Sequence, residues 1–470
     1  MRAQRSAEIA HNSEHWVDRR RILIRVGIPI LILLVVALGA AMAGMEQFVI
    51  GAAPVAVVAL LVSLEFMMRR NDLYPVIILF SALYIPISFS TGTASRVVLS
   101  LALTVAFTFL WFFQMVLERR FTVKPSPINL PLFLFCCATL FSLVWSSGFR
   151  DPIVTVWGSF PFVQMASALV FIMSVVTVLL TSNLITRRSL LVTIVVLFII
   201  AGFLGFIDHI LPIKLPVDTN GLFSMWIVAI AVGMGFINNK LPVWVRGLLI
   251  ILALLWIYWG FIRNITWLAG WVPVFFVILV ISFLRSPKLA IFLFIVLAII
   301  IYIQWDYLST SLSLESRTSG LTRLDAWKQN WLITKDHFLF GTGPAGYAVY
   351  YMTYFPRRAM ATHNNYLDML SQVGIVGSIF LVWLFGAIIW RGINLVKRLH
   401  GRHDFLEAFA IIGLSGTLGG LLMMMFGDWL FPFAYTQSIA GFNYSVYNWL
   451  FMGAMLALDH MTCKLKEEPS

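Results

Sequence analysis

Apolar segments long enough to cross a lipid bilayer recur along almost the entire chain. Of its 470 residues, 60% are hydrophobic and only 11% are charged, and the mean hydropathy is +0.90. A transmembrane helix needs roughly 20 predominantly apolar residues, and a helix satisfies its own backbone hydrogen-bonding groups inside lipid. The sequence therefore predicts an all-α polytopic membrane protein and excludes a water-soluble domain of this length.

The apolar runs between polar breaks predict about 12–14 transmembrane helices. The run at 244–260 is the weakest, because Arg246 shortens it. The candidate helices lie near residues 23–44, 47–67, 73–91, 97–117, 128–147, 162–181, 190–211, 221–237, 244–260, 265–284, 289–305, 371–390, 405–427 and 441–458.

The distribution of Lys and Arg predicts how these helices are oriented. If the amino terminus is cytoplasmic, every inner connection carries at least two basic residues, as cytoplasmic loops usually do. The short outer loops then hold only Arg96, Arg150, Lys214 and Arg263. We therefore expect a basic cytoplasmic segment at 1–21, helices at 22–305, an outer catalytic loop at 306–370, helices at 371–458 and a cytoplasmic tail at 459–470.

Composition and motifs exclude several classes of function. The basic residues that give the net charge of +12 lie mainly in the loops that orient the helices. We therefore expect no nucleic-acid partner. Cys136, Cys137 and Cys463 show neither a disulfide framework nor metal-ligand spacing. The glycines at 341–346 fit GxGxxG but lack a strand–helix–strand context, so we exclude a dinucleotide site. The scattered acids of the outer loop and the absence of HExxH and Walker sequences argue against a metal-dependent enzyme or an ATPase.

The outer loop is expected to contain amphipathic helices. Leu324, Trp327, Trp331 and Leu332 recur at helical spacing between charged residues, which predicts a helix on the membrane surface. A second helix is expected to begin near Asn364 or Asn365 and to continue into the apolar run at 371–390.

His363 is the leading candidate for a general base, because an imidazole titrates near neutral pH. At a helix N-terminus, the helix dipole disfavours the imidazolium form. The alternative is a capping or hydrogen-bonding surface histidine.

Arginine residues at the expected outer face are candidates for binding phosphate or pyrophosphate. Arg263 lies between two apolar runs, and arginine at membrane depth usually has a function. Arg317 and Arg323 bracket the start of the amphipathic helix, and their planar guanidinium groups suit phosphate oxygens. The alternative is that these side chains extend to lipid headgroups.

Asp218 and Asn220 precede the apolar run at 221–237. They could line a cavity, but an aspartate before an apolar run is more often a helix cap.

A set of motifs resembles the O-antigen ligase and Wzy-type O-antigen polymerase superfamily. His363-Asn364 is followed by nine residues and then by Gly374-x-x-Gly377. Arg323-Leu-Asp-Ala-Trp327 and the turn Gly341-Thr-Gly343-Pro resemble a second family element, in which Arg317 also fits the arginine position. Arg263 resembles the arginine of a mid-chain helix in the family, and Asp218-Thr-Asn220 its Asp-Pro-Asn element.

The resemblance implies a membrane glycosyltransferase that transfers or polymerises an undecaprenyl-diphosphate-linked glycan at the outer face of the bacterial cytoplasmic membrane. It implies an inverting reaction with no cofactor, nucleotide sugar or metal. The acceptor would be a glycan, a lipid A core or a protein hydroxyl, so a ligase, a repeat-unit polymerase and a protein O-oligosaccharyltransferase stay open. A flippase of lipid-linked oligosaccharides is the alternative from another class, but here the charges concentrate in one loop, which favours an enzyme.

The resemblance also implies a role for each matching residue. His363 would be the catalytic base. The pyrophosphate ligands would be Arg263, Arg323 and Arg317. The supporting residues would be Asn364, Asp218, Asn220, Gly341, Gly343, Gly374 and Gly377.

Overall fold

The computed structural model describes residues 65–464 except 66, 91–95, 212–213, 264–267, 304, 307–308, 310–320 and 356–360. The chain divides into the units Met1–Asn71 and Asp72–Ser470, and the second of these is described below. Arg317, the predicted helix at 23–44 and nearly all of the run at 47–67 lie outside the described residues.

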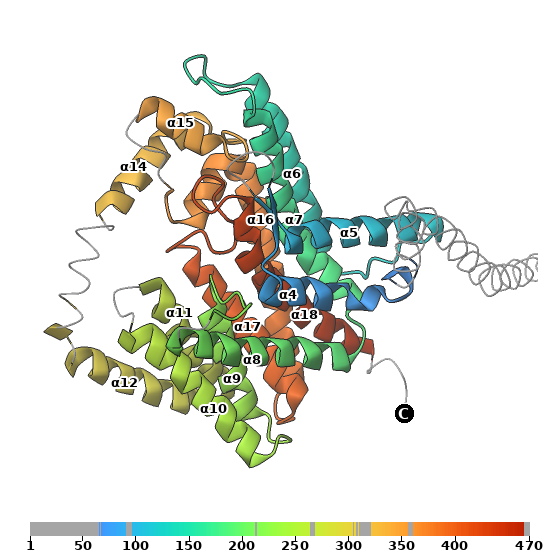
Figure 1. Cartoon of the computed structure of the whole chain (residues 1–470), viewed down its shortest axis with the longest axis vertical. Helices are drawn as coiled ribbons and strands as arrows, with labels where there is room; N and C mark the ends of the chain where they lie inside the picture. Colours follow the sequence, from blue (N-terminus) through green and yellow to red (C-terminus); the bar gives the residue numbers. More distant parts are fainter. Residues whose placement is uncertain are drawn as a thin grey trace, which may run out of the picture. The chain divides into compact units, whose positions relative to one another are not determined.

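Each of the other predicted apolar runs corresponds to a helix (Figure 1). These helices are α4 (Tyr74–Tyr84), α5 (Leu99–Leu117), α6 (Asn129–Gly148), α7 (Phe160–Leu184), α8 (Arg188–Ile210), α9 (Phe223–Ile237), α10 (Val243–Ile257), α11 (Leu268–Arg285), α12 (Pro287–Ile303), α16 (Asn365–Leu399), α17 (Phe405–Met423) and α18 (Phe442–Lys464). The weak run at 244–260 continues from α10 into a π-helical turn, η3 (Tyr258–Arg263).

Seven helices of the described part are long and apolar enough to cross a membrane. They are α5, α6, α7, α8, the continuous helix Val243–Arg263, α16 and α17. Shorter apolar helices include α9, α11 and α12. The protein is therefore an all-α polytopic membrane protein, as predicted.

Among the described residues of the predicted outer loop, the structure has two helices with defined bounds between α12 and α16 (Figure 1). The expected amphipathic helix is α14 (Leu321–Asp336), and it is followed by α15 (Gly346–Tyr354), which was not predicted. In α14 it is Ala326, Asn330 and Thr334 that are fully buried, whereas Leu324 and Trp331 are half exposed. Of the predicted apolar stripe, Trp327 is partly buried, whereas Leu324 and Trp331 stay exposed. Contact of the exposed part with lipid stays a prediction.

The helix predicted at 73–91 ends early. It stops at Tyr84, because the residue before Pro86 is driven into an extended conformation, here φ −124° and ψ 80° at Ile85. The chain continues into a short antiparallel hairpin of β1 (Ser88–Ser90) and β2 (Arg96–Val98). The short 3₁₀ turns are η2 (Asn71–Leu73) and η5 (Ile439–Gly441).

The interior of the Asp72–Ser470 unit is built around α9, α17 and α18. Trp226 of α9 is fully buried, stacks on Phe451 of α18 with ring centroids 4.4 Å apart, and donates its indole N–H to Asn448 at 2.6 Å. A side chain at Gly416 of α17 would overlap the Trp226 ring. The small residue therefore lets α17 approach α9 closely, as small residues do in membrane bundles.

Helix α16 is interrupted at Gly374, and the interruption is where the predicted glycine motifs meet. Gly374 has φ 68° and ψ −175°, a region that is essentially restricted to glycine. The exposed backbone of the break is paired with the turn after α14: Thr342 donates to the Ser371 carbonyl at 2.8 Å and Ile375 to the Phe338 carbonyl at 2.8 Å. Any side chain at Gly374 would overlap the carbonyl of Leu339.

The other three motif glycines also permit close packing. A side chain at Gly341 would overlap the Gln372 carbonyl, and one at Gly343 would overlap Ser146 of α6. One at Gly377 would crowd Val373 at 2.7 Å. Gly341 and Gly374 therefore let the turn at 337–345 approach the start of α16, and Gly343 lets the same turn approach α6.

We expect Gly374→Ala to destabilise the protein by roughly 1–3 kcal/mol, because alanine does not adopt this backbone conformation without strain. Gly386→Ala is the matched control on the same helix, since no atom lies within 4 Å of its added Cβ. There the helical backbone should gain about 0.5–1 kcal/mol. Thermal unfolding of the two variants in detergent, followed by tryptophan fluorescence, tests the difference, and equal midpoints would contradict it.

Candidate functional site

The site is built at the start of α16, where Asn364 is the N-cap. Its Oδ1 accepts hydrogen bonds from the backbone N–H groups of Tyr366, at 3.0 Å, and Leu367, at 3.3 Å. This confirms that the helix begins at Asn364 or Asn365. His363 immediately precedes the cap with φ 50°, a left-handed conformation that is uncommon for a residue with a side chain. The cap and this turn set the direction of the imidazole.

Asn365 attaches the connection between α17 and α18 to this helix start. Its Nδ2 donates to the Phe431 carbonyl at 2.8 Å, and its Oδ1 accepts from the N–H groups of Leu430 and Phe431. Its own backbone N–H donates to the Met424 carbonyl at 2.7 Å. The segment between Met424 and Leu430 is thus held over the start of α16, and it contains Asp428.

Asp428 is the nearest acidic partner of His363. Its Oδ2 lies 3.5 Å from Nδ1 of the imidazole, slightly more than a normal hydrogen bond. The Asp428 side chain is 0% exposed, whereas the His363 side chain is 41% exposed. One edge of the ring therefore faces a buried acid, and much of the rest of the ring stays open.

Asp368 forms a pair of buried acids with Asp428. The two carboxyl groups interact electrostatically, and Thr362 donates its hydroxyl to Asp368 at 2.6 Å. Two neighbouring buried carboxyl groups are unfavourable when both are charged, which favours a proton on one of them. Burial raises the pKa of Asp428, and the interactions with Asp368 and with the charge of Arg323 oppose this rise. We infer that the pair retains a proton that a solvent-exposed pair would lose.

Arg323 completes the site from the first turn of α14. Trp327, one turn further on, donates its indole N–H to the Thr362 carbonyl at 2.8 Å, which fixes α14 beside His363. Burial lowers the pKa of His363, and the positive charge of Arg323 lowers it further, while Asp368 raises it. His363 is therefore a neutral imidazole near neutral pH, which is the form that accepts a proton.

The structure does not bring every predicted residue to His363. Arg263 is exposed at the end of η3 and forms no hydrogen bond or ion pair with any other described residue. Its predicted role stays a prediction, as does that of Arg317, which lies outside the described part of the chain.

Asp218 and Asn220 belong to a separate polar network. Oδ1 of Asp218 accepts from the Asn220 side chain at 2.8 Å, and Oδ2 accepts from Asn443 of α18 at 2.7 Å. The Asn220 carbonyl accepts from the Tyr447 hydroxyl at 2.6 Å. Interpreting Asp218 as a helix cap was wrong, since α9 begins at Phe223 with Leu222 as its N-cap. Tyr444 lies within electrostatic range of both Asp218 and Asp428.

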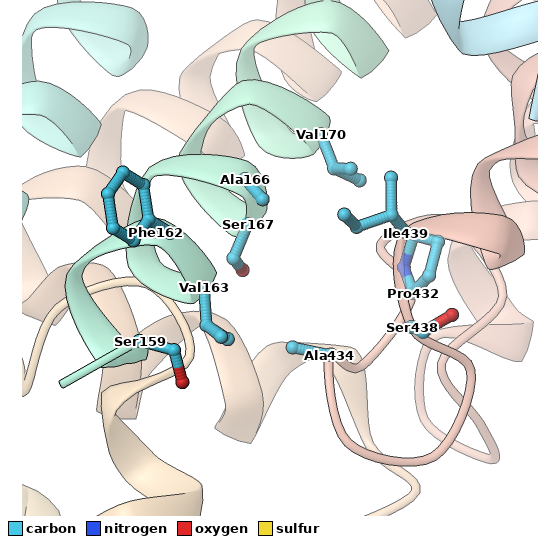
Figure 2. Close-up of a pocket in the computed structure, with 10 residues that line it drawn as sticks. All are labelled: Ser159, Phe162, Val163, Ala166, Ser167, Val170, Pro432, Ala434, Ser438 and Ile439. Carbon is cyan, nitrogen blue, oxygen red and sulfur yellow. The ribbon is translucent and has the colours of Figure 1, made fainter. Parts of the chain in front are cut away.

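An apolar groove runs beside the segment that carries Asp428. Figure 2 shows it between α7 and the chain at 432–439. Its volume is about 360 Å³. The lining is mainly aliphatic and includes three serines: Ser159, Phe162, Val163, Ala166, Ser167, Val170, Pro432, Ala434, Ser438 and Ile439.

Sequence reasoning missed Asp428 and the partners of Asp368. Asp428 stands alone in the apolar stretch MMMFGDWLFPF, and a lone acid in such a setting is by itself a signal of function. Asp368 is one of the scattered acids of the predicted outer loop. No local sequence pattern relates Asp368 to Asp428, which follows the next helix, α17.

Part of the chain is similar to a known protein family. Residues 217–382 match the model of the O-antigen ligase family. The matched range contains Asp218, Arg263, Arg323, His363 and the glycine pair of α16, and it ends before Asp428. This match agrees with the resemblance seen in the sequence and supports a function of the membrane glycan ligase or polymerase type. No match is found among curated proteins.

We expect Arg323→Gln to raise the pKa of His363, because the guanidinium charge now lowers it. Without that charge, the imidazolium forms at a higher pH. Diethyl pyrocarbonate modifies only the neutral imidazole, so the pH midpoint of His363 modification, measured by peptide mass spectrometry, should move upward. Lys328→Gln removes a charge from an exposed position of the same helix and should shift the midpoint much less. An unchanged midpoint in Arg323→Gln would show that its charge does not act on His363.

Proposed function

We propose that this protein transfers an undecaprenyl-diphosphate-linked glycan to an acceptor hydroxyl, with His363 as the general base. One observation carries the proposal: a partly exposed imidazole, whose pKa is lowered by burial and by the charge of Arg323, lies 3.5 Å from a buried acid and inside the O-antigen ligase match. A general base must be neutral and reachable by its substrate. His363 meets both conditions.

In the proposed reaction, the acceptor oxygen attacks the anomeric carbon of the donor sugar while His363 takes the hydroxyl proton. The bond between that carbon and the diphosphate oxygen breaks, and undecaprenyl diphosphate leaves. A single displacement of this kind inverts the anomeric configuration. The arginine charges would balance the charge that grows on the diphosphate, so the scheme requires neither a nucleotide sugar nor a metal.

Asp428 would act as a positioning residue. If it accepts a hydrogen bond from the Nδ1–H of His363, the proton-accepting nitrogen is Nε2. Once His363 is protonated, Asp428 at 3.5 Å becomes the counter-charge of the imidazolium. The buried pair therefore supports the histidine without having to contact the sugar.

The apolar groove beside α7 would hold part of the isoprenoid chain of the donor. Three observations support this assignment: its aliphatic lining, its place on a helix of membrane-spanning length, and its continuity with the chain that carries Asp428. An isoprenoid seated there would bring its diphosphate toward the site from the membrane side. The distribution of basic residues supports an outer-face position for this site.

We expect His363→Ala to abolish glycan transfer, with a loss of about 10²–10⁴-fold for a missing general base. In the wild type, activity should fall as the imidazole becomes protonated. This should occur only below about pH 6.5, the ordinary pKa of histidine, because the pKa of His363 is lowered. The assay uses purified protein and a lipid-linked donor. His400→Ala, at the opposite end of α16, is the matched control and should keep its activity. Near-normal turnover in His363→Ala would refute the mechanism.

We expect Arg323→Ala to weaken use of the diphosphate-linked donor by roughly 1.5–3 kcal/mol, the value of a charge-assisted hydrogen bond. Arg323→Lys should restore the pKa of His363 but little of the donor affinity, because lysine lacks the planar fork. Arg263→Ala should cause a similar loss of donor affinity if Arg263 also holds the diphosphate. Unchanged kinetics in Arg263→Ala would instead assign this arginine to lipid headgroups.

A further inference from the structure

A second cluster of polar side chains lines a cavity at the opposite end of α14. The cavity has a volume of about 270 Å³. It is formed by the end of α14, by α15 and by the connection between α6 and α7. Its polar lining residues are Asp151, Lys335, Asp336, His337, Tyr350 and Tyr354.

Asp151 holds this cluster together. Its carboxylate accepts a hydrogen bond from the Tyr354 hydroxyl at 2.8 Å and lies 3.3 Å from Nε2 of His337. Its backbone N–H donates to the Tyr350 hydroxyl at 3.1 Å. The His337 ring meets Tyr350 edge-on, with centroids 4.7 Å apart. These contacts fix the side chains before any ligand arrives, which lowers the entropy cost of binding.

The cluster keeps hydrogen-bonding capacity for a ligand. The His337 side chain is 10% exposed, and its buried Nε2 has no well-formed hydrogen bond with any described residue. The Asp151 side chain remains 33% exposed. Asp151 raises the pKa of Tyr354 to about 12, so this hydroxyl stays protonated.

We propose that this cavity is a carbohydrate subsite that binds a sugar of the glycan at a distance from the reacting carbon. The proposal rests on the proposed function. Carboxylate, imidazole and phenol groups can pair with sugar hydroxyls, while Leu332, Ile333 and Phe355 provide an apolar wall for the C–H face of a sugar ring. Asp151 and Asp336 offset Lys335, so the lining does not favour a phosphate.

Helix α14 sets the spacing between the two sites. Arg323, near its start, acts on His363, and His337 follows its end. Fourteen positions separate them, which corresponds to about 21 Å along a helix. A glycan whose anomeric carbon lies near His363 would therefore reach the cavity only with sugars remote from that carbon, and a donor with a single sugar would not.

The test is direct binding of soluble oligosaccharide, released by mild acid from the lipid-linked donor, to the full-length protein in detergent. It is made in the His363→Ala background so that no transfer occurs. Tyr354→Phe and Asp151→Ala should each weaken binding, the latter roughly tenfold or more for a lost charge-assisted hydrogen bond. Tyr302→Phe, at an 82% exposed tyrosine of α12, and Lys328→Gln are the controls and should bind normally. Thermal unfolding checks that each variant is folded.

Transfer kinetics with His363 intact then identify which substrate the cavity holds. The cavity variants should raise KM for a donor with a long glycan several-fold and leave kcat, and the kinetics of a single-sugar donor, unchanged. A raised KM for a glycan acceptor instead assigns the cavity to the acceptor. Normal oligosaccharide binding by folded Asp151→Ala and Tyr354→Phe overturns the subsite. If wild type transfers no glycan but still binds oligosaccharide through Asp151, the proposed reaction fails and the subsite stands.

Discussion

A buried polar group in a bundle this apolar needs a partner within the protein, and the partners that the buried amides of α16 find in other segments organise the structure around the site. Asn365 is 0% exposed and uses both its amide oxygen and its amide nitrogen on the connection between α17 and α18. Gln372 uses its side-chain oxygen on the N–H of Ala345 and its carbonyl on Ser142. The non-helical segments are therefore held to α16 by side chains of α16 itself.

The same contacts explain why the imidazole is suited to accept a proton. His363 is held outside the helix by the Asn364 cap, beside an arginine and a pair of buried acids. Burial and the arginine charge both favour the neutral ring, whereas the acids stabilise the charge that appears on protonation. A more exposed histidine would keep an ordinary pKa but would lack the fixed orientation. The arrangement thus favours base catalysis over a purely capping role.

The fold around this site depends on glycines as much as on polar groups. Gly374 interrupts α16 with a backbone conformation that leaves hydrogen-bonding groups unpaired within the helix, and the turn after α14 pairs them. The turn can approach because Gly341 and Gly343 have no side chains. This contact joins α14 to α16, and α14 in turn carries Arg323 at one end and the His337 cluster at the other.

The sequence by itself determined the helices and the local features of the site. Apolar runs predicted most of the helices, because the bilayer requires length and hydrophobicity, which can be read directly. The bounds were less accurate where helices extend past the apolar run: α16 continues to Leu399 and α18 to Lys464, beyond the predicted ends at 390 and 458. The start of α16 near Asn364 was predicted as well, because side-chain preferences at a helix start act over a few residues. The break at Gly374 was not predicted, since the helix was expected to continue through it. The early end of α4 was not predicted, although Pro86 is in the sequence. The helix was assigned from an apolar run that continues past this proline.

Only the tertiary structure decided which charges meet. Asp428 follows α17 and His363 precedes α16, so no sequence periodicity relates these two residues. They are close because α17 runs back along α16 and returns the chain to the start of α16. Packing likewise decides which side of α14 is buried: Asn330 and Thr334 are fully buried, while Trp331 is half exposed. Hydrophobicity predicts which segments leave water, but the pairing of buried polar groups depends on the contacts that packing creates.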